Sequence, residues 1–126
     1  MERLEIEPSK MTPKVILDKE QRIFCIEGNS MPENPTQFYN PILDWVKECI
    51  KDSKTKIVFD FKIQYFNTSS SKMFLCLLEL MESAASKGVE ISINWHFANG
   101  DDEMKEAGEE LLELVSLPYA LLENDF

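Results

Sequence analysis

Residues 56–72, which read KIVFDFKIQYFNTSSSK, join a strand pattern to a helix start near the centre of the chain. Apolar side chains alternate from Ile57 to Tyr65, and the β-branched and aromatic types that strands favour are frequent. Val58 and Phe66 keep the second face of this strand partly apolar. We therefore expect the strand to be central in a sheet.

Short strands and one helix are predicted ahead of this segment. Residues 15–17 and 23–26 are apolar runs joined by a polar turn, which is typical of a hairpin, and residues 4–6 alternate as a further short strand. The Asn-Pro pair at residues 34–35 is typical of a helix cap followed by proline in the first turn. Because an interior proline breaks or kinks a helix, we expect the long helix to restart at Pro41.

Two helices and one strand are predicted after the central strand. The first helix covers residues 67–87, with Gly88 as its stop. Residues 89–95 alternate as a strand, and residues 101–115 form the second helix. The tail, residues 118–126, forms a short strand or lies on the surface. The core stripe expected for the last helix consists of Met104, Ala107, Leu111 and Leu114.

This order of elements predicts the α/β class: a single domain over residues 1–126, with a mixed β-sheet and helices packed on it. A chain of 126 residues suits one domain, and a hydrophobic content of 44% is enough for a core. Strand-helix-strand crossovers favour parallel neighbours and right-handed connections, whereas the hairpin is antiparallel.

The charge balance argues against several classes of partner. Asp and Glu outnumber Lys and Arg by 23 to 13, and the net charge of −10 repels nucleic acid and anionic membrane surfaces. No apolar run reaches the roughly 18 residues of a membrane span. The N-terminus lacks the apolar core of a signal peptide, so we expect a cytoplasmic protein without nucleic-acid or membrane binding.

The residue types present offer little for catalysis, metals or cofactors. The sequence has one histidine, His96, no CxxC pair and no glycine-rich phosphate loop, so we expect no metal, no cofactor and no catalytic residue. The acidic run at residues 101–110 lacks the ligand spacing of a calcium loop and is interpreted as a solvated helix face. Cys25, Cys49 and Cys76 have apolar neighbours and are interpreted as buried thiols in a reducing compartment.

Four hydroxyl side chains in succession, residues 68–71, follow the central strand. Capping explains one of them, because Asn67 or Thr68 can accept a hydrogen bond from a free amide of the first turn, worth about 1 kcal/mol. The alternative is a phosphoacceptor site. A phosphate at a helix start meets free amides and the positive end of the helix dipole, while it adds about −1.5 to −2 charges to the surface. The local pattern favours capping and leaves both interpretations open.

The helix start and the end of the strand at residues 89–95 are expected at the same end of the sheet. There we expect a groove near Thr68 lined by aromatic residues, with Trp95 as core or groove wall and without catalytic machinery. A hydrolase with Thr68 or Ser69 as nucleophile would need a base, and His96 is the one histidine available. A histidine without an assigned partner is interpreted as structural.

The block YFNTSSSK, residues 65–72, is the most specific of several segments that match one known family. On these segments, which span most of the chain, the sequence resembles the SiaC family of bacterial regulatory phosphoproteins, which act in biofilm regulation and have a STAS-like fold. The further matching segments are LEIEP (4–8), TPKV (12–15), PENP (32–35), FY (38–39), PILDW (41–45), NW (94–95), DEM (102–104) and EAGE (106–109).

The resemblance implies a non-enzymatic switch in which capping and phosphorylation coexist. In the family a partner serine/threonine kinase phosphorylates a threonine of this block, which corresponds to Thr68, and a PP2C-like phosphatase restores it. The resemblance implies that the unmodified form binds and activates a diguanylate cyclase and so raises cyclic di-GMP. The residues expected at the partner-binding surface are Tyr65, Phe66, Asn67, Ser69, Ser70, Ser71, Lys72 and Trp95.

An alternative function with the same fold is a STAS-like anti-sigma factor antagonist in a partner-switching pathway. Such an antagonist also carries a hydroxyl at a helix start, so the sequence separates the two functions poorly. The identity of the partner, a cyclase or an anti-sigma factor, distinguishes them.

Overall fold

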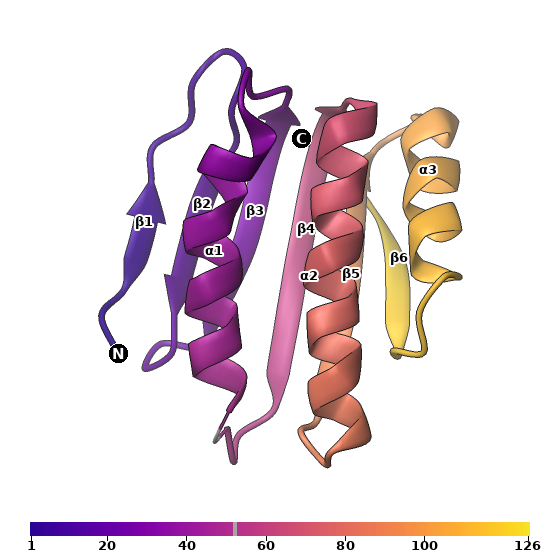
Figure 1. Cartoon of the computed structure of the whole chain (residues 1–126). Coiled ribbons are helices and arrows are strands. Elements are labelled where there is room, and N and C mark those ends of the chain that lie inside the picture. Colours follow the sequence, from indigo (N-terminus) through magenta and orange to yellow (C-terminus); the bar gives the residue numbers. More distant parts are fainter. Residues whose placement is uncertain (52) are drawn as a thin grey trace.

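Six strands form one sheet in which the spatial order follows the chain, β1-β2-β3-β4-β5-β6. The structure is a computed structural model that describes residues 1–51 and 53–126 (Figure 1). The strands are β1 (Leu4–Ile6), β2 (Lys14–Asp18), β3 (Ile23–Ser30), β4 (Ile57–Phe66), β5 (Ile91–Ala98) and β6 (Tyr119–Asn124), and the helices are α1 (Pro35–Ile50), α2 (Thr68–Ser86) and α3 (Asp102–Leu112).

The sheet is mixed, as the sequence predicted. β1, β2 and β3 pair antiparallel, and the predicted hairpin of β2 and β3 is confirmed. The pairs β3–β4, β4–β5 and β5–β6 are parallel. The long strand β4 therefore lies between two parallel neighbours in the interior of the sheet, which confirms its central position. The tail forms β6 at the edge.

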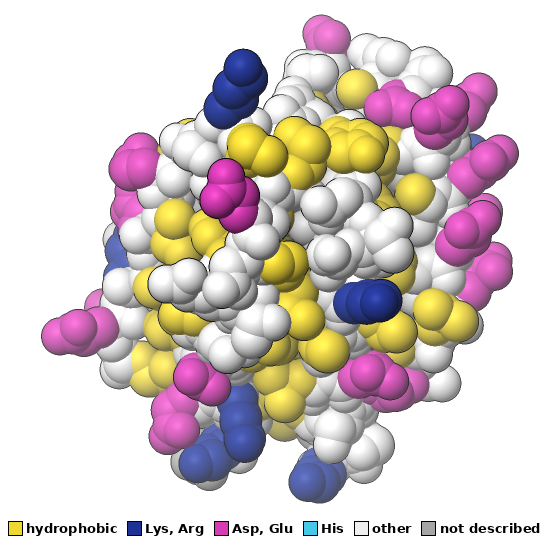
Figure 2. All heavy atoms as spheres, turned by 45° about the horizontal axis from the view of Figure 1, so that its top comes forward, with side chains coloured by type: hydrophobic (Ala, Val, Ile, Leu, Met, Phe, Trp, Pro, Cys, Tyr) yellow, Lys and Arg dark blue, Asp and Glu magenta, His cyan; other side chains and the backbone are white. Residues whose placement is uncertain are grey.

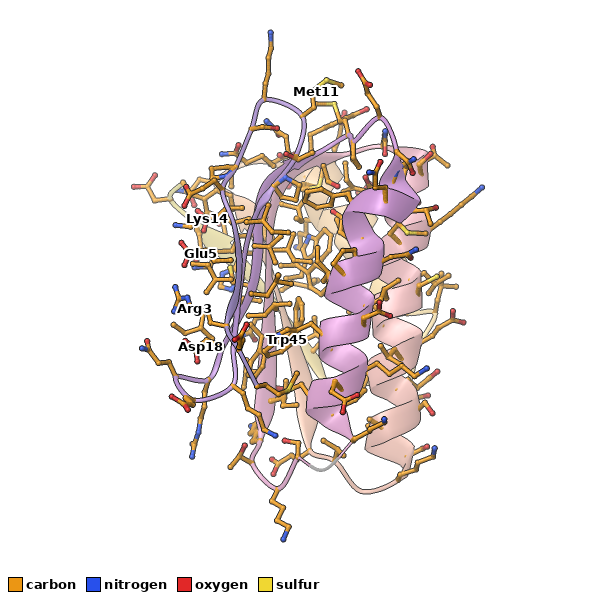
Figure 3. All side chains as sticks on the ribbon, turned by 60° about the vertical axis from the view of Figure 1, so that its left-hand side comes forward. Arg3, Glu5, Met11, Lys14, Asp18 and Trp45 are labelled. Atoms are coloured by element: carbon orange, nitrogen blue, oxygen red, sulfur yellow. The ribbon has the colours of Figure 1, made fainter. Side chains whose placement is uncertain are left out.

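All three helices lie on one face of the sheet, because each parallel crossover is right-handed and each moves one strand further in the same direction. Figure 3 shows α1 and α2 on one side of the sheet. The opposite face carries no helix in the described part of the chain. The domain is thus a two-layer α/β structure with one covered and one open sheet face.

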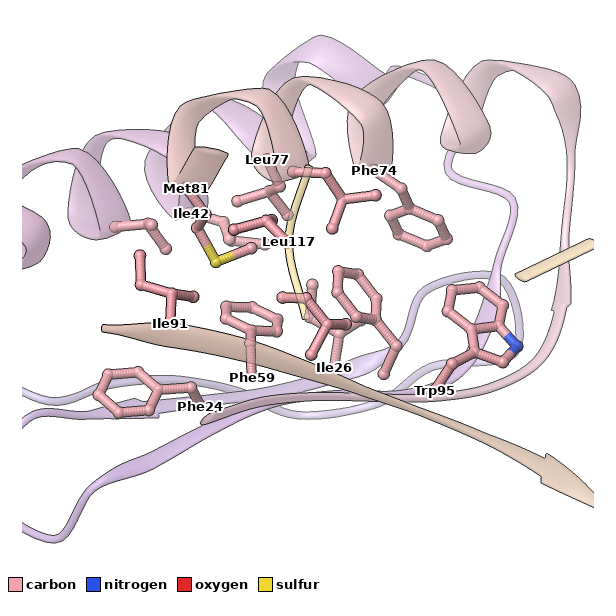
Figure 4. Packing of buried hydrophobic residues seen from close by; sticks show 14 of the residues in the cluster. Phe24, Ile26, Ile42, Phe59, Phe74, Leu77, Met81, Ile91, Trp95 and Leu117 are labelled. Atoms are coloured by element: carbon pink, nitrogen blue, oxygen red, sulfur yellow. The ribbon is translucent and has the colours of Figure 1, made fainter. Parts of the chain in front are cut away.

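The core fills the layer between the sheet and the helices. Along β4 the side chains alternate: Ile57, Phe59 and Phe61 are buried under the helices, whereas Val58 and Asp60 are half-buried on the open face. Figure 4 shows the buried side chains of the sheet packed against those of the helices. This alternation follows from the two-residue period of a strand, which the sequence displayed.

Four aromatic rings form a cluster where β4 meets α2. Trp95 of β5 stacks on Phe61 with ring centroids 5.5 Å apart, and Phe74 of α2 lies 5.4 Å from Phe61. Phe66, at the end of β4, packs against Phe74 at 5.3 Å and Trp95 at 5.9 Å. Each such pair contributes about 0.5–1.5 kcal/mol beyond the area that it buries, so this cluster fixes the start of α2 on the sheet.

Side chains hold the short edge strand β1 in place (Figure 3). Arg3 donates to Asp18 of β2 at 3.0 Å, and the Trp45 indole of α1 donates to the backbone carbonyl of Glu2 at 2.7 Å. The backbone N–H of Gln21 and the Arg3 guanidinium lower the pKa of the Asp18 carboxyl. These contacts protect an edge of only three residues.

The restart expected at Pro41 is wrong: α1 runs without a break from Pro35 to Ile50. A proline inside a helix removes one hydrogen bond, from its own position to the carbonyl four residues earlier. Pro41 lies on the exposed side of α1, where water can satisfy that carbonyl. The buried face of the helix, which includes Tyr39 and Ile42, is unaffected.

The last helix is shorter than expected, because α3 ends at Leu112 and turns back toward β6. Hydrogen bonds from Leu114 to Leu111 and from Val115 to Leu112 form this turn. The expectation that Leu114 belongs to the core is consequently wrong: its side chain is 65% exposed. No helix of the described residues is both long and apolar enough for a membrane span.

α3 approaches β5 most closely at Gly108. A Cβ added at this position would lie 2.2 Å from the indole ring of Trp95. The same indole donates to the backbone carbonyl of Met104 at 3.0 Å, so α3 rests directly on the tryptophan. The close packing of α3 on Trp95 therefore requires glycine at position 108.

Gly108→Ala is expected to lower the free energy of unfolding by about 2 kcal/mol. The overpacking against Trp95 costs about 3 kcal/mol, and the better helix propensity of alanine offsets about 1 kcal/mol. Urea denaturation measures this change. Glu106→Ala, on the exposed side of the same helix, serves as the control, and equal stability of the two variants would contradict the packing argument.

Candidate functional site

The start of α2 is capped by Asn67, which resolves the alternative left open between Asn67 and Thr68. The Asn67 side-chain oxygen accepts from the backbone N–H of Ser70 at 2.9 Å, and its backbone carbonyl accepts from Ser71 at 3.0 Å. The Asn67 backbone N–H donates to the carbonyl of Ser30 at 3.2 Å, at the end of β3. The cap leaves the hydroxyl of Thr68 free for another role.

The four successive hydroxyl groups have different environments. Ser70 is completely buried, whereas Thr68 and Ser69 are exposed. Ser71 is half-buried, and its hydroxyl donates to the backbone carbonyl of Thr68 at 2.7 Å. Two of the four hydroxyls are therefore structural, and two are accessible to a modifying enzyme.

A chain of buried hydroxyls anchors the helix start. The Ser70 hydroxyl donates to the backbone carbonyl of Ser30 at 2.8 Å. The Ser30 hydroxyl must then donate to the Ser70 oxygen, 2.7 Å away, and the Tyr39 hydroxyl to the Ser30 oxygen, 2.5 Å away. Burial raises the pKa of Tyr39 well above its usual value, so the phenol stays protonated. This chain ties β3, α1 and α2 together beneath Thr68.

A groove of about 350 Å³ lies between the start of α2 and α3. Thr68 and Ser71 line it from α2, and Glu110 lines it from α3. The expectation of an aromatic lining is corrected, because Phe66 is the one aromatic residue of the lining and the other apolar residues are aliphatic and come from α3 and the turn after it. The apolar lining residues are Phe66, Met104, Ala107, Leu111 and Leu114.

Figure 2 brings this end of the molecule forward and shows acidic side chains gathered along the margin that α3 forms. The acidic residues of α3 are Asp102, Glu103, Glu106, Glu109 and Glu110. The exposed aliphatic side chain of Leu114 lies at the groove as well. The surface next to Thr68 thus combines an apolar depression with an acidic rim.

Two of the residues predicted at the partner-binding surface are inaccessible. Ser70 is buried in the hydroxyl chain, and Trp95 is 1% exposed, within the aromatic cluster. We therefore correct the expectation that these two side chains contact a partner: they support the surface from beneath. The alternative that Trp95 belongs to the core is confirmed.

The other residues predicted for this surface are accessible to different extents. Tyr65 is 50% exposed and Lys72 is exposed, but neither lines the groove. Phe66 and Asn67 are half-buried and line it, and Ser69 is exposed on the first turn. Their roles in binding stay predictions.

The groove wall that α3 provides was missed from the sequence. Glu110 was assigned to a solvated acidic face. The spacing in the sequence could have indicated this wall. Glu110 lies three residues after Ala107 and four before Leu114, which in a helical pattern places the three side chains on one face. The apolar stripe of Met104, Ala107, Leu111 and Leu114 was predicted to belong to the core, but these residues also line the groove.

His96 does not lie beside Thr68. Its side chain is on the open face of the sheet, where its Nε2 donates to Asp60 at 2.7 Å and its Nδ1 accepts from the Asn124 amide. Thr68 lines a groove on the helix side. The structural interpretation of His96 is supported, and the hydrolase hypothesis lacks its base. The described residues contain no cluster of three potential metal ligands.

The three cysteines differ in accessibility. Cys49 is buried and Cys25 is half-buried, and burial raises the pKa of the Cys25 thiol to about 11. Burial also raises the pKa of Cys49. Cys76 is exposed on α2, so the expectation that all three thiols are buried is confirmed for Cys49, met in part by Cys25 and wrong for Cys76. Apolar neighbours in sequence indicate burial poorly in a helix, where adjacent residues point in different directions.

Comparisons with known proteins agree over nearly the whole chain. Residues 6–124 match the model of the SiaC family regulatory phosphoproteins. An uncharacterized protein of Pseudomonas aeruginosa (strain UCBPP-PA14) is 30% identical over 125 residues, which cover 99% of each chain.

Solved structures of SiaC have the same fold. The crystal structure of apo-SiaC from P. aeruginosa superposes with a TM-score of 0.91 at 30% identity, over 97% of this chain and 99% of that chain. The crystal structure of the diguanylate cyclase SiaD in complex with its activator SiaC, also from P. aeruginosa, matches with a TM-score of 0.91 at 30% identity, over 96% and 99% of the two chains. The chain therefore belongs to the SiaC family.

Ser70→Ala is expected to lower the free energy of unfolding by about 1–2 kcal/mol, because the buried Ser30 hydroxyl loses its acceptor and the Ser30 carbonyl loses one of its two donors. Chemical denaturation measures the loss. The matched control is Ser69→Ala, one residue earlier and exposed, which is expected to change stability by less than about 0.5 kcal/mol. Equal effects of the two substitutions would show that the buried hydroxyl chain does not anchor the helix.

Thiol labelling with an aromatic disulfide reagent at pH 8 is expected to show one fast cysteine, Cys76. A thiol with a pKa of about 11, as for Cys25, is thiolate in only about one molecule in a thousand at this pH. Cys25 and Cys49 are expected to react only after urea is added. Cys76→Ser should remove the fast phase, and a second fast thiol would contradict the burial described.

Proposed function

We propose that this member of the SiaC family is a non-enzymatic, phosphorylation-controlled regulator whose unmodified form binds and activates a diguanylate cyclase. The accessible hydroxyl of Thr68 beside the groove carries this proposal. The solved complex of SiaD with its activator SiaC, which has the fold of this chain, supports a cyclase as the partner over an anti-sigma factor. Activation of such a cyclase raises cyclic di-GMP.

Thr68 combines the properties that a reversible modification site needs. Its side chain is exposed and lines the groove, and Asn67 performs the capping that would otherwise occupy it. Ser70 is excluded by burial, and the Ser71 hydroxyl is engaged with the Thr68 carbonyl. Ser69 is exposed but does not line the groove. A group attached to Thr68 therefore changes the surface at the groove most directly.

The proposed modification is a phosphoryl transfer. A serine/threonine kinase transfers the γ-phosphoryl group of ATP to Thr68 Oγ1. The new Oγ1–P bond forms while the bond between the γ-phosphorus and the β-phosphate oxygen breaks. ADP and the proton of the hydroxyl group are released. A PP2C-like phosphatase hydrolyses the ester to the hydroxyl and inorganic phosphate. The kinase needs ATP, which the cytoplasm supplies, and we propose that the protein acts in this compartment.

Phosphate at Thr68 prevents binding chiefly through desolvation and bulk. The group brings about −1.5 to −2 charges to the margin of a groove in which five of the nine lining residues are apolar. A partner that covers this surface has to remove water from the anion, and the desolvation of a charge is strongly unfavourable. The unmodified hydroxyl carries no such cost. The phosphorylated helix start itself remains folded, because it lies at the positive end of the α2 dipole.

Thr68→Ala is expected to bind the cyclase of the same organism within about twofold of wild type, and Thr68→Glu to bind it about tenfold more weakly. Titration calorimetry measures the affinity, and the rate of cyclic di-GMP formation measures activation. The charge control is Gln64→Glu, on the open face of the sheet, which is expected to bind as wild type.

Mass spectrometry of the protein incubated with its kinase and ATP tests the modification itself. Wild type is expected to gain one phosphate on Thr68, and the Thr68→Ala protein none. If the Thr68→Ala protein were phosphorylated to the same extent as wild type, the assignment of the site would be wrong.

A further inference from the structure

We propose that Glu110 of α3 and Lys72 of α2 position the phosphate that Thr68 carries: Glu110 excludes it from the groove, and Lys72 holds it over the outer side of α2. The inference rests on the proposed function, since it concerns the phosphorylated state. It assigns a regulatory role to the acidic helix α3, which the sequence analysis interpreted as a solvated face.

The helix geometry places the two charges on opposite sides of Thr68. Successive residues of an α-helix are separated by about 100°, so Ser71 lies about 60° to one side of Thr68 and Lys72 about 40° to the other. Ser71 lines the groove together with Thr68, whereas Lys72 is exposed and does not. A phosphate on Thr68 therefore has two directions available, toward the groove or toward Lys72.

The groove side repels the phosphate. Glu110 is the one charged residue that lines the groove in the described part of the chain, and the other residues of its α3 wall are apolar. β4 contributes the uncharged ring of Phe66. Apolar walls weaken the screening between two anions, so the carboxylate and the phosphate repel each other more strongly than in water.

On the groove side, Ser71 cannot stabilise the phosphate with a hydrogen bond. The Ser71 hydroxyl donates to the backbone carbonyl of Thr68, so its proton is not available to a phosphate oxygen. On the other side, the Lys72 ammonium has three donors on a flexible stem and lies one turn from Thr68 on the helix surface. Both effects favour the rotamer of Thr68 that points toward Lys72.

This arrangement has a consequence for the switch. A phosphate held on the outer side of α2 stays in contact with water and within reach of a phosphatase, while it still lies on the surface that a partner must cover. Glu110 in this way keeps the modification removable. A phosphate that entered the groove would be shielded by Leu111 and Leu114.

The test is a ³¹P NMR titration of the full chain with phosphothreonine incorporated at position 68 during translation, which needs no kinase. The second pKa of the phosphate lies near 6 and reports the charges around it. Glu110→Gln is expected to lower this pKa by about 0.3, because a repelling charge is removed, and Lys72→Ala to raise it by about 0.3.

Matched controls separate local from general charge effects. Glu106→Gln makes the same change on α3 at an exposed position outside the groove, and Lys87→Ala removes an exposed lysine at the opposite end of α2 from Thr68. Each control is expected to shift the phosphate pKa by less than about 0.1. Equal shifts for Glu110→Gln and Glu106→Gln, or no shift for Lys72→Ala, would overturn the proposal.

The outcome is independent of the proposed function. If the cellular kinase left Thr68 unmodified, the proposed function would fail, while the titration of the incorporated phosphothreonine would still report the local charges. All four substituted positions are exposed, so the variants are expected to fold as wild type, which amide NMR spectra of the same samples verify.

Discussion

The chain of hydroxyls from Tyr39 through Ser30 to Ser70 determines where α2 begins. It is buried, and each of its members has a partner, so it joins β3, α1 and α2 in one arrangement. The Asn67 cap adds a second connection to Ser30. With Ser70 held inside, the helix period places Thr68 outside. The exposure of the proposed phosphoacceptor thus depends on a neighbour that can never be modified in the folded state.

The two-layer architecture concentrates the proposed regulation on one side of the molecule. Three crossovers in the same direction place α1, α2 and α3 next to one another, so α2 and α3 can enclose a groove at the carboxyl ends of the parallel strands. The network of Asp60, His96 and Asn124 occupies the open face of the sheet. This network connects the parallel strands β4, β5 and β6 and does not contribute to the groove.

Much of this fold could be predicted from the sequence, because strong periodicities coincide with clear stop and start signals. The strand ending at Phe66 and the helix after Asn67 are examples, and so is the mixed sheet. The uninterrupted helix through Pro41 could not be predicted, because a helix tolerates an interior proline only where the carbonyl that loses its partner faces water. The positions of Ser70 and Trp95 likewise depend on tertiary packing: a run of four similar hydroxyls gives no indication of which one points inward. The groove wall from α3 required the spatial approach of two helices that are separate in sequence.

The close approach of α3 to the indole of Trp95 gives the molecule an optical property. Tryptophan fluorescence depends on the packing and polarity around the ring, and Trp95 lies against Gly108 and Phe66, directly under the groove. The second tryptophan, Trp45, is bonded to the backbone of Glu2 near the opposite edge of the sheet. Any occupant that displaces α3 would change the emission of the first indole and leave that of the second unaltered, so the protein carries its own spectroscopic reporter.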